Sequence, residues 1–253
     1  MLSRSGLRAA LVAVAALGMT AMTVLPAAAF TDAEKAELGP LIREYLIKNP
    51  EVLQEAISVL EKRQSDAEAQ ARSKTLAEIK PLVFDSPRGV VIGNPKGDVT
   101  LVEFFDYNCG YCKHTLSDIN ALIKANPNLK VVLREFPVLG PGSVEAAQVA
   151  VTVRMVAPDK YMAFHQALLG GRGQADRARA LAAAKEVGID PALLQKQASS
   201  PELNATLDES MKIAQALGLN GTPSFVIGDD VIVGAVGLEK LQQAVSGSKT
   251  VAN

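Results

Sequence analysis

The sequence contains few cysteines and histidines and has almost no net charge, which excludes several classes of protein. Cysteine and histidine each occur twice in 253 residues, and acidic and basic side chains nearly balance, at a formal net charge of −1. Small secreted domains held together by disulfides are rich in cysteine, which this chain is not. A zinc site needs about four ligands, and here both histidines, His114 and His165, would have to join both cysteines. The near-neutral balance, with no evident basic face, argues against a nucleic-acid partner. The two cysteines therefore need another explanation.

Long apolar runs are confined to the beginning of the chain. Arg4 and Arg8 precede a mostly apolar stretch over residues 9–24, and small alanines follow it at residues 27–29. This pattern is typical of a cleavable secretory signal, which we place at residues 1–29. An uncleaved membrane anchor is the alternative, but threonines and many small alanines interrupt the run. We therefore expect the chain to be exported.

The two cysteines lie three positions apart, at Cys109 and Cys112, between a strand-like run over residues 99–105 and an amphipathic helical pattern. A strand thus delivers Cys109 to the first turn of a helix, where unpaired N–H groups and the helix dipole stabilise a thiolate. Cysteines in such C-x-x-C motifs can have a pKa of roughly 3.5–7.5, against about 8.5 for a free thiol. The pattern favours thiol–disulfide exchange over a structural disulfide or half of a metal site.

Residues 30–84 predict a helical segment distinct from the rest of the chain. Thr31 and Glu34 fit a capping box, and Asn49-Pro50 ends one helix and opens the next. The charged residues 61–80 contain too few large apolar side chains to pack on a core, which indicates an exposed helix or spacer. Both helices carry an apolar stripe that needs a partner, either a second copy or the chain's own domain. The stripe comprises Leu38, Leu41, Ile42, Tyr45, Leu46, Val52, Leu53, Ala56, Ile57 and Leu60.

The remaining residues alternate strands and helices and then turn purely helical. Strand patterns occupy residues 90–92, 99–105, 129–136, 224–227 and 231–233. The strand–helix–strand order around the cysteines implies parallel pairing with a right-handed crossover. Residues 140–217 carry only helical patterns and predict a helical insertion. The surrounding residues 85–139 and 218–253 would then form one α/β domain.

These residues resemble those of a known family. The Cys109-Gly110-Tyr111-Cys112 motif after a strand, with Gly221-Thr222-Pro223-Ser224-Phe225 before a hairpin, resembles the DsbA-type thioredoxin-fold thiol–disulfide oxidoreductases. The segment from Arg43 to Leu53 is similar to the stalk of the suppressor-of-copper-sensitivity C proteins, periplasmic relatives of which some assemble through that segment. The resemblance implies an α/β fold class: a thioredoxin fold with a helical insertion, preceded by an α-helical stalk.

The resemblance also implies roles for residues beside the cysteines. Cys109 would be the nucleophile and Cys112 the resolving thiol, together forming the redox-active disulfide. Glu103 would lie beneath them and help proton transfer from the resolving thiol, although an exposed or hydrogen-bonded strand glutamate is the alternative. His114 is expected in solvent and His165 in the core. No metal site and no cofactor are expected.

Substrate contacts would come from two short segments. Gly110 and Tyr111 tune the redox potential and border the site. Thr222 and Pro223 would form a cis-proline loop that presents the Thr222 backbone to an extended substrate, where the alternative is an ordinary turn.

The sequence and the resemblance together indicate a periplasmic oxidoreductase acting on exported, cysteine-containing proteins and served by a membrane redox partner. The Gly-Tyr pair, Thr222 and the stalk favour a disulfide isomerase that forms a homo-oligomer through residues 30–80, with a trimer as one option. Two alternatives stay open: a monomeric dithiol oxidase, and a protective protein that binds copper(I) with both thiolates.

Overall fold

The computed structural model describes residues 31–251, so the signal peptide expected at residues 1–29 lies outside the described part. The chain divides into two compact units between Leu60 and Glu61. Within the described residues, no helix combines the length and the apolar character needed to cross a membrane.

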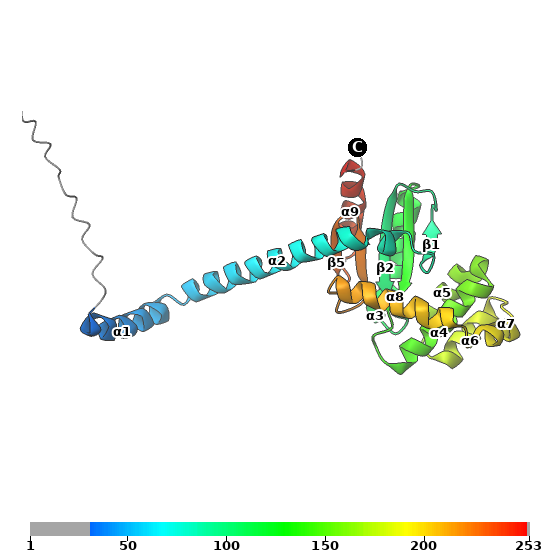
Figure 1. Cartoon of the computed structure of the whole chain (residues 1–253), viewed down its shortest axis with the longest axis horizontal. Coiled ribbons are helices and arrows are strands. Elements are labelled where there is room, and N and C mark those ends of the chain that lie inside the picture. Colours follow the sequence, from blue (N-terminus) through cyan, green and yellow to red (C-terminus); the bar gives the residue numbers. More distant parts are fainter. Residues whose placement is uncertain (1–30, 252–253) are drawn as a thin grey trace, which may run out of the picture. The chain divides into compact units, whose positions relative to one another are not determined.

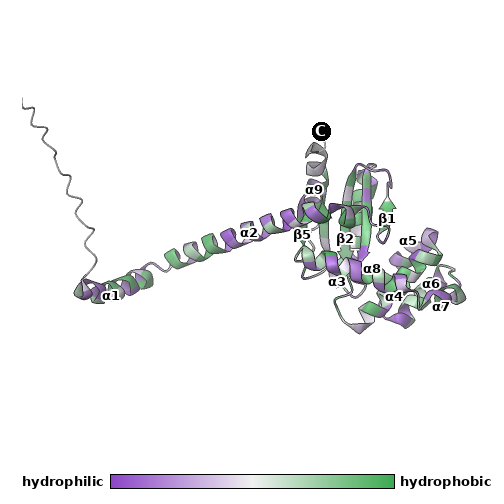
Figure 2. Cartoon of the chain, viewed as in Figure 1, coloured by the Kyte–Doolittle hydropathy of each residue, from purple (hydrophilic) through white to green (hydrophobic). Residues whose placement is uncertain are grey.

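The first unit contains helix α1 (Asp32–Lys48) and the beginning of helix α2 (Glu51–Phe84). The predicted capping box is confirmed, because the Glu34 N–H donates to Thr31 Oγ1 and the Thr31 N–H donates to Glu34 Oε2. Asn49 ends α1 by donating its main-chain N–H to the Tyr45 carbonyl, and Pro50 precedes α2. In Figure 2 the ribbon of α1 and of the first turns of α2 carries much of the green that marks hydrophobic residues. The exposed ones are Leu38, Leu41, Ile42, Tyr45, Ile47, Leu53, Ile57, Val59 and Leu60.

The second unit is built on a five-stranded mixed sheet with the order β1-β3-β2-β4-β5 (Figure 1). Its strands are β1 (Val90–Gly93), β2 (Val99–Phe105), β3 (Leu129–Glu135), β4 (Ser224–Ile227) and β5 (Asp230–Val233). The predicted parallel pairing of β2 with β3 is confirmed, and the other neighbours are antiparallel. Both central strands are almost wholly buried, as expected where helices cover both faces.

Helices cover both faces of this sheet, and the helical insertion lies at one end of it. Helix α3 (Gly110–Ala125) links β2 to β3, and α9 (Leu238–Val251) follows the final hairpin. The insertion consists of α4 (Pro141–Val156), a short 3₁₀ turn at Pro158–Lys160, α5 (Tyr161–Leu169), α6 (Arg177–Glu186), α7 (Pro191–Gln197) and α8 (Pro201–Ala216). Side chains that alternate along β2 lie in two different apolar cores. Leu101 and Phe105 belong to one core, and Val102 and Phe104 belong to the other. The predicted fold class is confirmed: a thioredoxin fold with added helices.

The last turns of α2 belong to the second core, which corrects the prediction of an exposed spacer over residues 61–80. Leu76 and Val83 are fully buried, and Ile79 packs beside them against the core that holds Val102 and Phe104. The prediction is confirmed for residues 61–75, which are helical and mostly exposed, and it is wrong from Leu76 onward. There three apolar side chains, spaced by three and four residues, make a narrow stripe that suffices for a helix lying on a sheet. The charged side chains around that stripe remain exposed.

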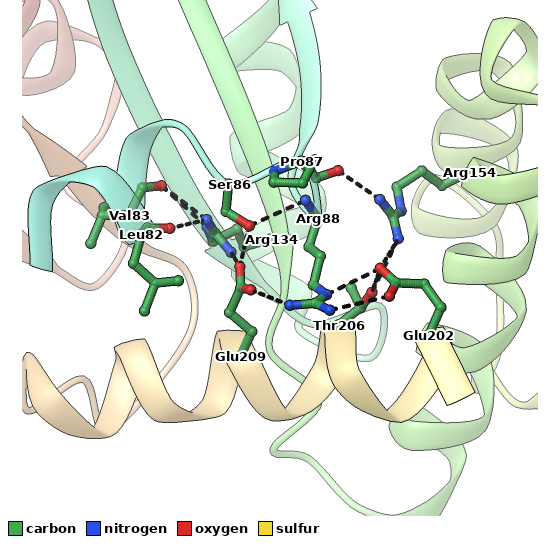
Figure 3. A network of polar contacts seen from close by, with 10 residues as sticks. All are labelled: Leu82, Val83, Ser86, Pro87, Arg88, Arg134, Arg154, Glu202, Thr206 and Glu209. Atoms are coloured by element: carbon green, nitrogen blue, oxygen red, sulfur yellow. Dashed lines mark hydrogen bonds and ion pairs between the residues drawn. The ribbon is translucent and has the colours of Figure 1, made fainter. Parts of the chain in front are cut away.

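A buried arginine fixes the end of α2 (Figure 3). Arg134 on β3 is fully buried and donates through Nη2 to the carbonyls of Leu82 and Val83, at 2.5 and 3.1 Å. Its Nη1 donates to Glu209 Oε1 on α8 at 3.0 Å. The guanidinium therefore satisfies carbonyls that a helix C-terminus leaves unpaired and also neutralises a nearly buried carboxylate.

A second set of contacts extends this network to the turn after α2. Arg88 pairs with Glu209 at 2.8 Å and with Glu202 at 3.1 Å, and Glu202 in turn pairs with Arg154 of α4 at 3.2 Å. Arg154 Nη1 donates to the Pro87 carbonyl at 2.7 Å, which closes a ring of polar contacts (Figure 3). The turn between α2 and β1 is thus held by β3, α4 and α8 together.

Replacing Arg134 by methionine should lower the free energy of unfolding by about 3–5 kcal/mol, because Glu209 and two helix carbonyls lose a buried donor. The matched control is Lys62→Met, which breaks an exposed pair with Asp66 on the same helix α2 and should cost less than about 1 kcal/mol. Urea unfolding of both variants measures the difference. Equal costs for the two substitutions would show that Arg134 is not an anchor.

Candidate functional site

Cys109 lies at the N-cap of α3, as predicted. Its Sγ accepts a hydrogen bond from the Cys112 N–H at 3.3 Å, and its thiol donates to the Thr222 carbonyl at 3.2 Å. Only 6% of the residue is exposed. The sulfur therefore lies where main-chain N–H groups at a helix start favour negative charge, in a residue that keeps a small contact with solvent.

Cys112 lies in the first turn of α3, directly inside Cys109, and is fully buried. Both cysteines are free thiols in this structure. Burial raises the pKa of the Cys112 thiol well above its usual value; the nearby Glu103 carboxylate adds to the rise, and a hydrogen bond with the Asp106 backbone opposes it. The two sulfurs are thus unequal, since only Cys109 has any contact with solvent.

Glu103 lies on β2, paired with Leu133 of β3 and Phe225 of β4, in the middle of the sheet. It is buried, so the alternative of an exposed strand glutamate does not hold. Burial raises its pKa from 4.5 to about 8. A carboxyl group in this condition holds a proton at neutral pH and can exchange it near that range.

The Thr222–Pro223 peptide bond is cis, as expected from the sequence motif. The Thr222 carbonyl accepts from the Cys109 thiol, so this loop lies against the sulfur although 113 residues separate the two in sequence. The Thr222 Oγ1 is buried and has no hydrogen-bond partner among the described residues. The structure thus brings together the two motifs that the sequence contains far apart.

Gly110 and Tyr111 are exposed at the start of α3, and Tyr111 is 69% accessible. Lys113 is exposed too, and its ammonium group donates to the Gly171 carbonyl after α5. His114 is exposed, as predicted. The aromatic ring of Tyr111 therefore lies exposed to solvent at the edge of the site.

Two residues of the turn before Cys109 were missed by sequence reasoning. Asp106 is buried and accepts the N–H groups of Asn108, Val138 and Leu139 at 2.8–2.9 Å. Asn108 exchanges hydrogen bonds with both main-chain groups of Ala175. The available signal was an acid and an amide between an apolar strand and a cysteine, which is typical of turns.

A buried polar chain ties this turn to the insertion. The Tyr107 hydroxyl lies 3.1 Å from His165 Nδ1 and 3.5 Å from the Tyr161 hydroxyl, which donates to Glu135 Oε1 at 2.7 Å. The core position predicted for His165 is confirmed, and burial lowers its pKa to about 3, so the ring is neutral. Burial raises the pKa of Glu135 to about 8.

Among the described residues, no group of three or more histidine, cysteine, aspartate and glutamate side chains is placed to hold a metal ion. The two thiols are therefore the soft ligands that this site itself offers.

A dithiol at the amino end of a helix, beside a cis-proline loop on a sheet of this topology, defines a thioredoxin-like redox protein. A family model described as a DSBA-like thioredoxin domain matches residues 100–246, more than half of the chain, and the chain belongs to that family. A model described as the copper resistance protein ScsC N-terminal domain matches residues 34–67.

Solved structures agree with this assignment. The chain is 45% identical to a thioredoxin-like oxidoreductase from Silicibacter pomeroyi DSS-3, covering 68% of this chain and 98% of that one at a TM-score of 0.65. It is 31% identical to the thiol-disulfide exchange protein alpha-DsbA2 from Wolbachia pipientis, covering 72% and 97% at a TM-score of 0.67. A linker-deletion mutant of Proteus mirabilis ScsC is 28% identical, covering 89% and 99% at a TM-score of 0.67.

Curated relatives match only in part. The Na(+)/H(+) antiporter NhaA 1 of Salinispora arenicola is 25% identical over 166 residues, which is 65% of this chain and 25% of the antiporter. The chain thus spans about a quarter of the length of the curated relatives that it matches.

Glu103→Gln should make the protein more resistant to alkaline destabilisation. Because the folded protein raises the pKa of Glu103 from 4.5 to about 8, stability is lost as the pH rises between these values. The free energy of unfolding of the variant, minus that of the wild type, should grow by about 1.4 kcal/mol per pH unit across this window. Urea titrations at several pH values measure it, with the exposed Glu78→Gln as control. A pH-independent difference would contradict the assignment of a protonated Glu103.

Proposed function

We propose that the chain is a periplasmic thiol–disulfide oxidoreductase that exchanges disulfides with exported proteins through Cys109 and Cys112. The observation that most supports this function is the position of the Cys109 sulfur, which accepts the Cys112 N–H and contacts the Thr222 carbonyl. A solved structure of a similar Salmonella enterica protein is described as a periplasmic thioredoxin-like protein, which supports the location.

In the proposed reaction the Cys109 thiolate attacks one sulfur of a substrate disulfide. The substrate S–S bond breaks, a mixed disulfide forms, and the second substrate sulfur leaves as a thiolate that takes up a proton. Cys112 then passes its proton to Glu103 in the fraction of molecules in which that carboxyl, with its pKa of about 8, is ionised. It attacks the Cys109 sulfur and breaks the bond between Cys109 and the substrate. The substrate leaves reduced, and the protein holds the Cys109–Cys112 disulfide. The same steps in reverse oxidise a substrate dithiol.

Isomerisation uses the same first step and a different second one. Another thiolate of the substrate attacks the mixed disulfide, forms a new substrate disulfide and returns Cys109 to its reduced form, so no net oxidation occurs. Gly110 and Tyr111 between the cysteines, and Thr222 before the cis-proline, support this mode through the resemblance. Thr222 and Pro223 would pair with an extended substrate backbone, and Tyr111 would cover it.

The N-terminal segment supports an oligomer. Its exposed apolar stripe along α1 and the beginning of α2 leaves large side chains such as Leu41, Ile47 and Leu60 each 64% accessible. Such contiguous apolar surface usually marks an interaction site, and we propose that residues 30–80 hold copies of the chain together, with a trimer as one option. Several redox sites would then face one misfolded substrate, and a membrane reductase would keep them reduced.

Two other functions would use the same cysteines, and specific observations support the second of them. A monomeric dithiol oxidase would use the same cysteines with a membrane oxidase as partner. A copper(I)-binding protective role is supported by the match of residues 34–67 to a copper resistance domain and by two free thiols three residues apart.

Replacing Cys112 by serine should trap mixed disulfides between Cys109 and exported proteins, because no thiol remains to release the substrate. Cys109→Ser should trap none, since Cys112 is buried. Non-reducing electrophoresis of periplasmic extracts from cells expressing each variant measures the adducts. A copper carrier would instead lose stoichiometric copper(I) binding in either variant and form no adducts, which would overturn the proposed function.

Deleting residues 31–60 should give a monomer that still exchanges thiols but rescues scrambled ribonuclease poorly. The deletion stops before Leu76 and Val83, which the core of the second unit needs. Sedimentation velocity gives the mass, and Ile57→Lys in the full chain tests the stripe with one charge, with Gln54→Lys on the same helix as control. A monomeric full-length chain that only oxidises reduced peptides would contradict the isomerase.

A further inference from the structure

Asp106 joins the turn that carries Cys109 to the segment that follows β3. Its Oδ1 accepts the Asn108 N–H at 2.8 Å, and its Oδ2 accepts the N–H groups of Val138 and Leu139 at 2.8 and 2.9 Å. Its main-chain carbonyl accepts the Cys109 N–H at 3.0 Å. Asp106 is 1% exposed, so these charge-assisted bonds are shielded from water and fix the two segments closely together.

A second residue makes the same connection. The side-chain amide of Asn108 donates to Ser143 Oγ at 2.9 Å, in the first turn of α4. The segment after β3 and the first turn of α4 are therefore both attached to the cysteine turn, at Val138–Leu139 and at Ser143. Because Phe136 still donates its N–H to the Phe105 carbonyl, the segment leaves the sheet at the level of this turn.

The segment presents apolar side chains to solvent even though its backbone is held so firmly. Val138 is 39% exposed and Leu139 is 53% exposed. One oxygen of the buried Asp106 carboxylate accepts both of their main-chain N–H groups, so the backbone that carries these two exposed side chains is fixed. Tyr111, at the start of α3, is exposed as well. Both of the segments that Asp106 joins, three residues before the nucleophile, therefore present apolar surface.

This step rests on the proposed exchange at Cys109. We infer that Asp106 is a positioning residue that holds Val138 and Leu139 as an apolar wall of the substrate site. The preferred substrates would be extended segments that carry a large apolar side chain next to the reacting cysteine. Burial of that side chain against Leu139 would strengthen binding of the mixed-disulfide transition state for such segments and leave glycine-flanked cysteines without this gain.

Asparagine at position 106 separates this role from a general structural one. Its amide oxygen can accept either the Asn108 N–H or those of Val138 and Leu139, and in each orientation the NH₂ group faces the other N–H donors. Asp106→Asn therefore keeps the shape of the side chain but breaks the link between the cysteine turn and the wall. Leu139→Ser removes the wall side chain at an exposed position, where folding is not at stake. Val91→Ser, on the edge strand β1, is the matched control for loss of an exposed apolar side chain.

The test uses the full chain and short peptides whose cysteine is disulfide-bonded to a chromophoric thiol and flanked by leucine or by glycine. The measurement is the ratio of kcat/KM for the leucine peptide to kcat/KM for the glycine peptide. The wild type and Val91→Ser should prefer leucine by about tenfold. Asp106→Asn and Leu139→Ser should bring the ratio close to one, chiefly through KM for the leucine peptide, and the double variant should lose no more than either single one.

The outcomes separate the two proposals. A wild type that exchanges with both peptides without preference would overturn the wall and leave the oxidoreductase standing. A wild type that exchanges with neither peptide would overturn the oxidoreductase itself. If Leu139→Ser lowers the ratio but a folded Asp106→Asn does not, Leu139 contacts the substrate and Asp106 does not position it. Should Asp106→Asn fail to fold, Leu139→Ser against Val91→Ser still decides whether the wall exists.

Discussion

The arrangement of the redox site depends on one contact, the hydrogen bond from the Cys112 N–H to the Cys109 sulfur at the start of α3. It exists because β2 ends just before the cysteine turn and the helix begins at Gly110, so the Cys112 N–H, which has no partner within the helix, points at the sulfur. The sheet, the cis-proline loop and the insertion all serve to hold this geometry. The Thr222 carbonyl fixes the sulfur from the opposite side.

The surroundings make the two cysteines chemically different. Cys109 has an edge in solvent, whereas Cys112 is enclosed and its thiol is held protonated by burial, which raises its pKa. A buried acid, Glu103, lies on the strand beneath and carries a proton near neutral pH for the same reason. An enclosed, protonated thiol suits a group that must stay inert until a mixed disulfide forms beside it. This difference arises chiefly from burial, and Glu103 adds to it.

Much of this arrangement could be predicted from the sequence, because periodicity and turn chemistry are local. The strands, the cap at Thr31, the position of Cys109 and the cis bond at Pro223 were all predicted. The burial of Leu76 and Val83 could not be, since a sparse stripe on a charged helix carries no sign of the sheet that covers it. Asp106 was missed because its partners, Val138 and Leu139, are more than thirty residues away and contribute only main-chain groups. Arg134 was missed because its partners, the Leu82 and Val83 carbonyls and the Glu209 carboxylate, are more than fifty residues away.

Cys109 should be the reactive sulfur because of where α3 begins. The most direct test is the rate at which iodoacetamide alkylates each cysteine of the reduced full chain at pH 7, resolved by peptide mass spectrometry and compared with glutathione. We predict that Cys109 reacts at least about tenfold faster than glutathione and that Cys112 stays unmodified in the folded protein. Alkylation of Cys109 no faster than that of glutathione, or of Cys112 first, would contradict this assignment.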